Sequence, residues 1–387
     1  MVTVPEVKDP RSGEFRRRAA LTTLLIVGLL GLRQLPVLLR NSPVSHRLGE
    51  IVGPMSNDEM ARENVDALVD GYYEGLRRDG TGAGLPGERD DIQFRDDFLR
   101  YEMKPNLKRP FKAGMRITNS MGMANPEYSY AKPPDTRRIA LLGDSLSLGP
   151  YGQDYVAKLE ERLNQNCRTP DIQNYQVLNF SVYAYSTVQM MDVGLDKAPK
   201  FHPDVYVYTM TDLETMDTEG WRTHVGTLLT AGTDLKYDYL RKVVADAGLQ
   251  STNHLPTIRK RLKPYMVPVT TWALEQVRDQ ARKQGASMII LMVPAPISPD
   301  MVNSDFNDLR IAADPVGVPI IDLRDTFRSV DLKTVWVDPG ADIHPNVLGH
   351  SMIANNLFAK LQNEPSAWQA LAGHPCQVAA PATTASK

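Results

Sequence analysis

The residues best suited to chemistry in this sequence are one serine and one histidine, each in a short polar segment. Ser145 follows Gly143 and Asp144, directly after a short apolar run. His344 lies towards the other end of the chain, and Asp342 stands two positions before it. A serine hydroxyl becomes an effective nucleophile when a histidine accepts its proton, and a carboxylate holds that histidine in the required tautomer. The pattern therefore predicts Ser145 as nucleophile, His344 as general base and Asp342 as the residue that orients the base.

Each of the two segments also has a structural interpretation. A Gly-Asp-Ser sequence is common in turns between a strand and a helix, and the segment 342–344 can cap a helix that follows it. The presence of both segments in one chain, in this order, favours the catalytic interpretation. Asp338 is a second candidate for the acid that orients the histidine.

The elements that must position these residues alternate along the chain between strand and helix. Alternation of this kind predicts an α/β fold with a parallel sheet between two layers of helices, and ligands bind at the carboxyl ends of such strands. Residues 212–285 are largely polar and are predicted to be a helical insertion. The predicted strands are 139–142, 175–180, 204–210, 287–293 and 318–323, and the predicted helices are 154–163, 271–284 and 346–361.

The composition excludes several classes of protein. The chain has 387 residues with 44 Lys and Arg against 46 Asp and Glu, so its formal net charge is −2. That balance argues against a dedicated nucleic-acid binder, which carries a basic face. Hydrophobic residues make up 42%, enough for a buried core. Cys167 and Cys376 are too few for a disulfide-dense domain or a four-cysteine zinc site, but they can pair outside the cytoplasm.

The two polar segments resemble sequence blocks of the SGNH/GDSL hydrolase superfamily, over roughly residues 138–361. The blocks are Gly143-Asp144-Ser145-Leu146-Ser147, Asn179-Phe180-Ser181-Val182-Tyr183-Ala184, Thr209-Met210-Thr211-Asp212 and Asp342-Ile343-His344-Pro345-Asn346. The resemblance implies a three-layer, flavodoxin-like parallel sheet and ester chemistry without a metal or another cofactor. It also implies an oxyanion hole built from the backbone N–H groups of Ser145 and Ala184 and from the side chain of Thr211.

Three positions depart from the family pattern. Ala184 stands where the family has glycine, so it keeps the backbone N–H but restricts φ. Thr211 stands where the family has asparagine, and its shorter side chain weakens the third oxyanion contact. Asp342 lies two residues before the histidine, where many members have three, although envelope polysaccharide O-acetyl-modifying relatives share the shorter spacing.

The functional prediction is a serine-dependent esterase or deacylase that acts on an ester of the cell envelope through an acyl-enzyme. Its substrate would be an acylated small molecule or glycan. An O-acyltransferase of envelope glycans on the same site is the alternative, because the residues alone do not choose between water and a sugar hydroxyl as acceptor. The two degenerate blocks also leave open a catalytically silent protein of this fold that binds glycans or assembles a complex. The oligomeric state stays open.

An apolar segment near the N-terminus predicts a membrane anchor. Residues 19–39 would form a helix about 31 Å long, close to the thickness of a bilayer core. Arginines precede the segment, which favours a cytoplasmic tail over residues 1–18. A cleaved signal peptide and a buried soluble helix are the other interpretations. An anchor predicts a single-pass protein of the cell inner membrane or plasma membrane, with its catalytic domain on the extracytoplasmic side.

The rest of the chain divides unevenly. Residues 40–135 are predicted to be a membrane-proximal extension with one helix, which begins at a capping sequence at Ser56 and ends near Leu76. Residues 136–363 are predicted to form the hydrolase-like domain. Residues 364–387 are predicted to be a disordered tail.

Overall fold

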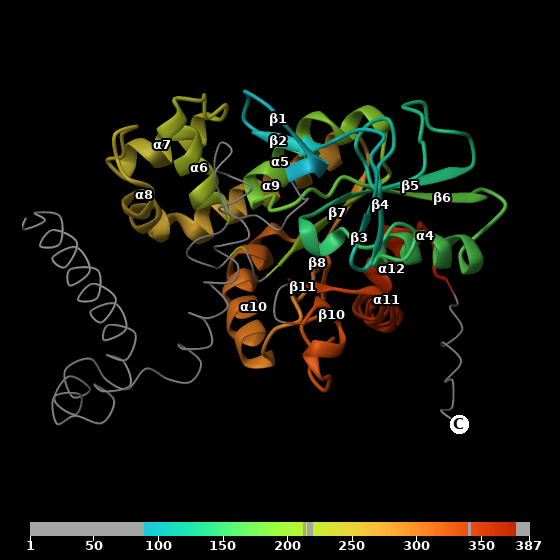
Figure 1. Ribbon diagram of the computed structural model, residues 1–387. Coiled ribbons are helices and arrows are strands. Elements are labelled where there is room, and N and C mark those ends of the chain that lie inside the picture. The colour runs from blue at the N-terminus through green and yellow to red at the C-terminus, as the bar shows by residue number, and fades with distance from the viewer. Residues whose placement is uncertain (1–88, 212–213, 215–219, 340–341, 377–387) are drawn as a thin grey trace, which may run out of the picture. The chain divides into compact units, whose positions relative to one another are not determined.

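The computed structural model describes residues 89–211, 214, 220–339 and 342–376 (Figure 1). The predicted membrane segment 19–39 and the predicted helix from Ser56 to about Leu76 lie outside these residues. Within the part of the chain that is described, no helix is both long enough and apolar enough to span a bilayer.

A five-stranded parallel sheet forms the centre of the fold, as the strand–helix alternation predicts. Its spatial order is β6-β5-β7-β8-β9. Counted along the chain from β5, this is the order 2-1-3-4-5 of flavodoxin-like sheets. All strands are parallel, and the order in which strands are added to the sheet reverses between strands 1 and 3. That switch point lies between β5 and β7. The strands are β5 (Thr136–Leu142), β6 (Asn174–Asn179), β7 (Val205–Met210), β8 (Ser287–Met292) and β9 (Ile320–Asp322).

Helices cover both faces of the sheet, which explains why its strands are apolar runs without alternation (Figure 1). Ile139 and Leu141 of β5 face a core shared with three helices, α4 (Tyr155–Asn166), α11 (Val347–Gln362) and α12 (Pro365–Ala372). Towards the other face, a Cβ atom added at Gly194 would lie 2.9 Å from Leu142 of β5. The helices on that side are α5 (Thr187–Asp196) and α9 (Met266–Lys283), and α10 (Pro299–Ala313) packs against α9.

The predicted insertion is helical and has a core of its own. It contains α6 (Gly220–Ala231), α7 (Asp238–Asp246) and α8 (Leu255–Leu262), and it leads into α9. Trp221, Leu240 and Ile258 are completely buried in this second core. Phe98 and Val188 join the same core from outside the insertion, so the insertion is packed onto the sheet domain rather than separate from it.

The described part of the N-terminal extension consists of two antiparallel hairpins, which the sequence did not reveal. The first pairs β1 (Ile92–Phe94) with β2 (Tyr101–Met103), and the second pairs β3 (Lys108–Phe111) with β4 (Gly114–Ile117). Both hairpins are too short to show a period-2 pattern. They pack beside the carboxyl edge of the sheet, where Tyr151 N–H donates to the carbonyl of Met115 at 2.9 Å.

The prediction of a disordered tail over residues 364–387 is wrong for its first part. Residues 365–372 form α12, whose Trp368 and Leu371 are buried in the main core. Pro365 occupies the first helical turn, a position where a proline is tolerated. Beyond this helix, a disulfide joins Cys167 at the end of α4 to Cys376, which ties the end of the described chain to the domain.

Candidate active site

Ser145, His344 and Asp342 form one continuous hydrogen-bonded chain. His344 Nε2 lies 2.8 Å from Ser145 Oγ, and His344 Nδ1 lies 2.7 Å from Asp342 Oδ1. In the tautomer that this arrangement favours, Nδ1 donates to the carboxylate and Nε2 accepts the proton of the serine. The serine is 1% exposed, and the side chains of His344 and Asp342 are each 14% exposed. The structure therefore brings together the three residues of the predicted triad in the order of a nucleophile, a base and an orienting acid.

The nucleophile stands on a tight turn directly after β5, at the switch point of the sheet. The turn contains η2 (Ser145–Ser147), and Asp144 caps it by accepting the N–H of Leu146 at 2.9 Å. Gly143 is required here because of space: a Cβ atom would lie 2.6 Å from Ser181 Oγ and 2.7 Å from Thr209 Oγ1. The Gly-Asp-Ser sequence thus follows from a crowded strand end at Gly143, a cap at Asp144 and a serine whose Oγ faces His344.

The base and its acid come from an antiparallel pair of strands near the C-terminus, β10 (Trp336–Asp338) with β11 (Asp342–Pro345). The carboxylate of Asp342 folds back along its own strand, where Oδ1 also accepts the backbone N–H of His344 at 3.0 Å. This contact explains how a two-residue spacing reaches the ring nitrogen. Directly after the hairpin, Asn346 caps α11 by accepting N–H groups of its first turn.

The environment of Asp342 keeps it ionised. Burial alone would raise the pKa of the carboxyl group, but the charge of His344 and two hydrogen bonds from it outweigh burial. The charge of Arg116, on β4 of the second hairpin, acts in the same direction. The pKa of Asp342 is therefore below its ordinary value, so the carboxylate is charged wherever the histidine works as a base.

Ala184 lies in the turn between β6 and α5, with a φ of 52°. This left-handed conformation is easy for glycine and strained for alanine, so the backbone keeps the shape that the family's glycine implies. Its backbone N–H makes no hydrogen bond to any described residue. That leaves this N–H able to bind an oxyanion.

Thr211 departs from its expected role. Its hydroxyl donates its single proton to Asp144 Oδ2 at 2.7 Å, so the geometry does not offer that proton to an oxyanion. Burial raises the pKa of Asp144, and the Thr211 and Leu146 hydrogen bonds oppose that rise. Thr211 therefore supports the nucleophile turn, and the predicted oxyanion hole is reduced to the backbone N–H groups of Ser145 and Ala184.

Asp338, the second candidate for the acid, and a further histidine of the C-terminal segment take structural roles. Asp338 forms an ion pair with Lys112 of the β3–β4 hairpin rather than contacting the histidine. His350 of α11 is fully buried, its Nδ1 accepts the N–H of Tyr155 at 3.4 Å, and burial lowers its pKa to about 3. Among the described residues, no group of three or more His, Cys, Asp or Glu side chains is arranged to hold a metal.

Two residues that support the site gave no signal in the sequence. Tyr101, on β2, hydrogen-bonds to the turn that carries Ala184. Glu214 is buried beside the start of α5, where its carboxylate accepts the N–H of Thr187 at 3.2 Å, and it also accepts the N–H of Trp221 at 3.1 Å. Neither residue belongs to a recognisable motif, because their contacts join segments that are far apart in the sequence.

The fold and the site together have the architecture expected for the SGNH/GDSL superfamily: a 2-1-3-4-5 parallel sheet with a Ser–His–Asp chain at its carboxyl edge. No family model matches the chain, and the comparison with curated proteins gives no match.

The solved structures that match this chain include the following three. A catalytic mutant of Axe2, an acetylxylan esterase from Geobacillus stearothermophilus, matches at 12% identity and a TM-score of 0.37, over 58% of this chain and 94% of that one. TesA matches at 16% identity and a TM-score of 0.34, over 59% of this chain and 99% of that one. LAE5, an alpha/beta hydrolase enzyme from the metagenome of Lake Arreo in Spain, matches at 17% identity and a TM-score of 0.37, over 58% of this chain and 94% of that one.

Proposed function

We propose that this protein is a serine esterase or deacylase that acts on an ester of the cell envelope. The observation that carries the proposal is the hydrogen-bonded chain from Ser145 Oγ through His344 to Asp342, with distances of 2.8 and 2.7 Å. It stands at the switch point of a parallel sheet, where ligands bind in such folds.

The reaction has two halves. Ser145 Oγ attacks the ester carbonyl carbon while its proton moves to His344 Nε2, and the N–H groups of Ser145 and Ala184 stabilise the oxyanion. His344 then gives the proton to the departing alcohol, which leaves an acyl group on Ser145. In the second half, His344 Nε2 takes a proton from water as the water oxygen attacks the acyl carbonyl carbon. The bond from that carbon to Ser145 Oγ then breaks, His344 returns the proton to Ser145 Oγ, and the carboxylic acid is released. A sugar hydroxyl in place of that water would make the same site a transferase.

Two features support an extracytoplasmic location. The apolar segment 19–39 with arginines before it is typical of a signal anchor. The disulfide between Cys167 and Cys376 is of a kind that persists in oxidising compartments. We expect an alkaline phosphatase reporter fused after Glu50 to be active in intact bacterial cells. Activity confined to a cytoplasmic reporter at the same position would contradict this placement.

The catalytic proposal is tested by hydrolysis of p-nitrophenyl acetate by the full-length protein. Ser145→Ala is expected to reduce kcat by about 10⁴-fold or more, because the nucleophile is removed. Ser147→Ala is the matched control, since it removes another buried hydroxyl of the same turn, one that contacts Tyr155 OH at 2.6 Å. Equal rates for Ser145→Ala and the parent protein would overturn the proposal.

A further inference from the structure

The turn that carries Ala184 needs support from outside itself. A non-glycine residue with φ near +52° costs about 1–2 kcal/mol relative to ordinary backbone. Within the turn, Tyr185 N–H donates to the carbonyl of Val182 at a length of 3.3 Å, which is a weak contact. Such a conformation persists only where the surrounding structure holds it. Part of that support comes from β2, in the first N-terminal hairpin.

Tyr101 contacts the peptide unit that contains the oxyanion donor. Its hydroxyl donates to the carbonyl oxygen of Tyr183 at 2.9 Å, and both tyrosines are at least 97% buried. That carbonyl and the N–H of Ala184 belong to the same planar peptide unit, so fixing the oxygen fixes the direction of the N–H. A hydrogen bond to the carbonyl also polarises the N–H, which strengthens it as a donor.

Further contacts fix Tyr101 against the turn. Tyr185 OH donates to the carbonyl of Tyr101 at 2.7 Å, so β2 and the turn are hydrogen-bonded in both directions. Tyr183 OH donates to Asp91 Oδ2 at 3.1 Å. Asp91 is itself completely buried and receives two hydrogen bonds from Arg109, each of 2.6 Å.

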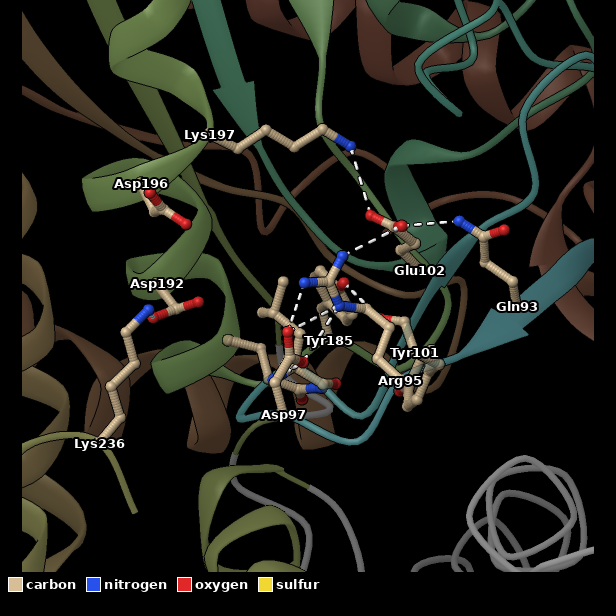
Figure 2. A network of polar contacts seen from close by, with 12 residues as sticks. Gln93, Arg95, Asp97, Tyr101, Glu102, Tyr185, Asp192, Asp196, Lys197 and Lys236 are labelled. Carbon is tan, nitrogen blue, oxygen red and sulfur yellow. Dashed lines mark hydrogen bonds and ion pairs between the residues drawn. The ribbon is translucent and has the colours of Figure 1, made fainter. Parts of the chain in front are cut away.

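A polar network ties β2 to the far end of α5 (Figure 2). Glu102, next to Tyr101 on β2, accepts from Gln93 at 2.6 Å and lies 3.1 Å from Arg95. Its other carboxylate oxygen lies 3.7 Å from Lys197, which ends α5. β2 is therefore held at two places: at the Ala184 turn through Tyr101, and at the end of α5 through Glu102 and Lys197.

We propose that Tyr101 is a positioning residue that orients the N–H of Ala184 as an oxyanion donor. The proposal rests on the proposed esterase function, and it makes the N-terminal extension part of the machinery that supports catalysis. Tyr101 itself touches neither the substrate nor the reacting atoms. It compensates for an alanine where a glycine would adopt the same turn without strain.

The test compares Tyr101→Phe with Tyr175→Phe in the full-length protein. Tyr175 is a matched control: it is 2% exposed, and its hydroxyl oxygen lies 2.8 and 2.9 Å from the carbonyl oxygens of Cys167 and Ala372, away from the turn. For Tyr101→Phe, kcat for p-nitrophenyl acetate is expected to fall about 10- to 100-fold, somewhat less than for loss of a whole oxyanion donor. KM is expected to stay within about twofold, because the oxyanion contact forms only in the transition state.

A second measurement does not need turnover. Amide hydrogen exchange of a peptide covering residues 181–186 is expected to accelerate in Tyr101→Phe and to match the parent in Tyr175→Phe. An unchanged kcat in a stably folded Tyr101→Phe overturns the proposal, and so does unchanged exchange. If parent and variant both lack Ser145-dependent hydrolysis, the esterase proposal fails, and the role of Tyr101 as an oxyanion-positioning residue fails with it. If Tyr101→Phe hydrolyses the ester at the same Ser145-dependent rate as the parent, the esterase proposal stands and the positioning role is wrong.

Discussion

The two sides of the proposed site differ in which atoms would do the chemistry. On the triad side these are three side chains, and the acid and the base are held within one short segment, where His344 N–H donates to Asp342. On the proposed oxyanion side they are backbone groups, and the turn of Ala184 is contacted by distant segments through Tyr101 and Tyr183. A site built from side chains is visible as a motif, whereas one built from backbone depends on neighbours that the motif does not contain.

After removal of the nucleophile itself, the largest effect is expected on the triad side, from Asp342→Asn. Asparagine keeps the shape but favours the wrong tautomer of the histidine, so kcat is expected to fall about 10⁴-fold. The steady-state rate on p-nitrophenyl acetate measures it. Asp338→Asn is the matched control, since Asp338 pairs with Lys112 instead of the histidine. If Asp338→Asn were the slower variant, the assignment of the acid would be wrong.

Glu214 contacts the start of α5, the helix that follows the turn of Ala184, and it makes the stability of this region depend on pH. Burial raises the pKa of Glu214 from 4.5 to about 7, although it accepts the N–H groups of Trp221 and Thr187. The folded state therefore binds this proton more tightly than the unfolded chain does. Its contribution to stability is fully present below pH 4.5 and is lost as the pH rises through 7.

Glu214→Gln removes this titration and keeps an amide oxygen as acceptor. The difference in the free energy of unfolding between pH 5 and pH 8 is expected to shrink by on the order of 2–3 kcal/mol in the variant. Urea unfolding at both pH values measures it. Parallel pH profiles for variant and parent would show that Glu214 is not the titrating group.

The smallest effect is expected from Ala184→Gly. Glycine adopts the positive φ of this position without strain, so the free energy of unfolding is expected to rise by about 0.5–1 kcal/mol. The backbone N–H is retained, and with it kcat. Ala247→Gly is the control, because Ala247 has a φ of −76° and gains nothing from glycine. A loss of stability in Ala184→Gly that equals the loss in Ala247→Gly would contradict the strain at this turn.

Much of the fold followed from local sequence patterns. The five central strands are short apolar runs bounded by polar residues, and the predicted helices at α4, α9 and α11 have an apolar face. Elements with a weak local signal were missed. α5 is buried almost all round and shows no polar face, and α12 is only eight residues long. The β1–β4 hairpins have strands of three or four residues, which are too short for a pattern.

The candidate site divides in the same way. Ser145, Asp342 and His344 were predicted from spacing and residue type, and the structure brings them together. The commitment of the Thr211 hydroxyl to Asp144 could not be predicted, because it depends on how β7 and the nucleophile turn lie side by side. The contact of Tyr101 with Tyr183 spans 82 positions and has no local signature.

The most direct test of the central claim is covalent capture by a fluorophosphonate, which reacts with activated serines. The full-length protein is labelled, digested, and mapped by mass spectrometry, with His344→Ala treated in parallel. We expect one phosphonylated residue, Ser145, and labelling that is slowed by several orders of magnitude in His344→Ala, because the base has been removed. An unlabelled Ser145 in the folded parent protein, or equal labelling in His344→Ala, would show that Ser145 is not a nucleophile activated by His344.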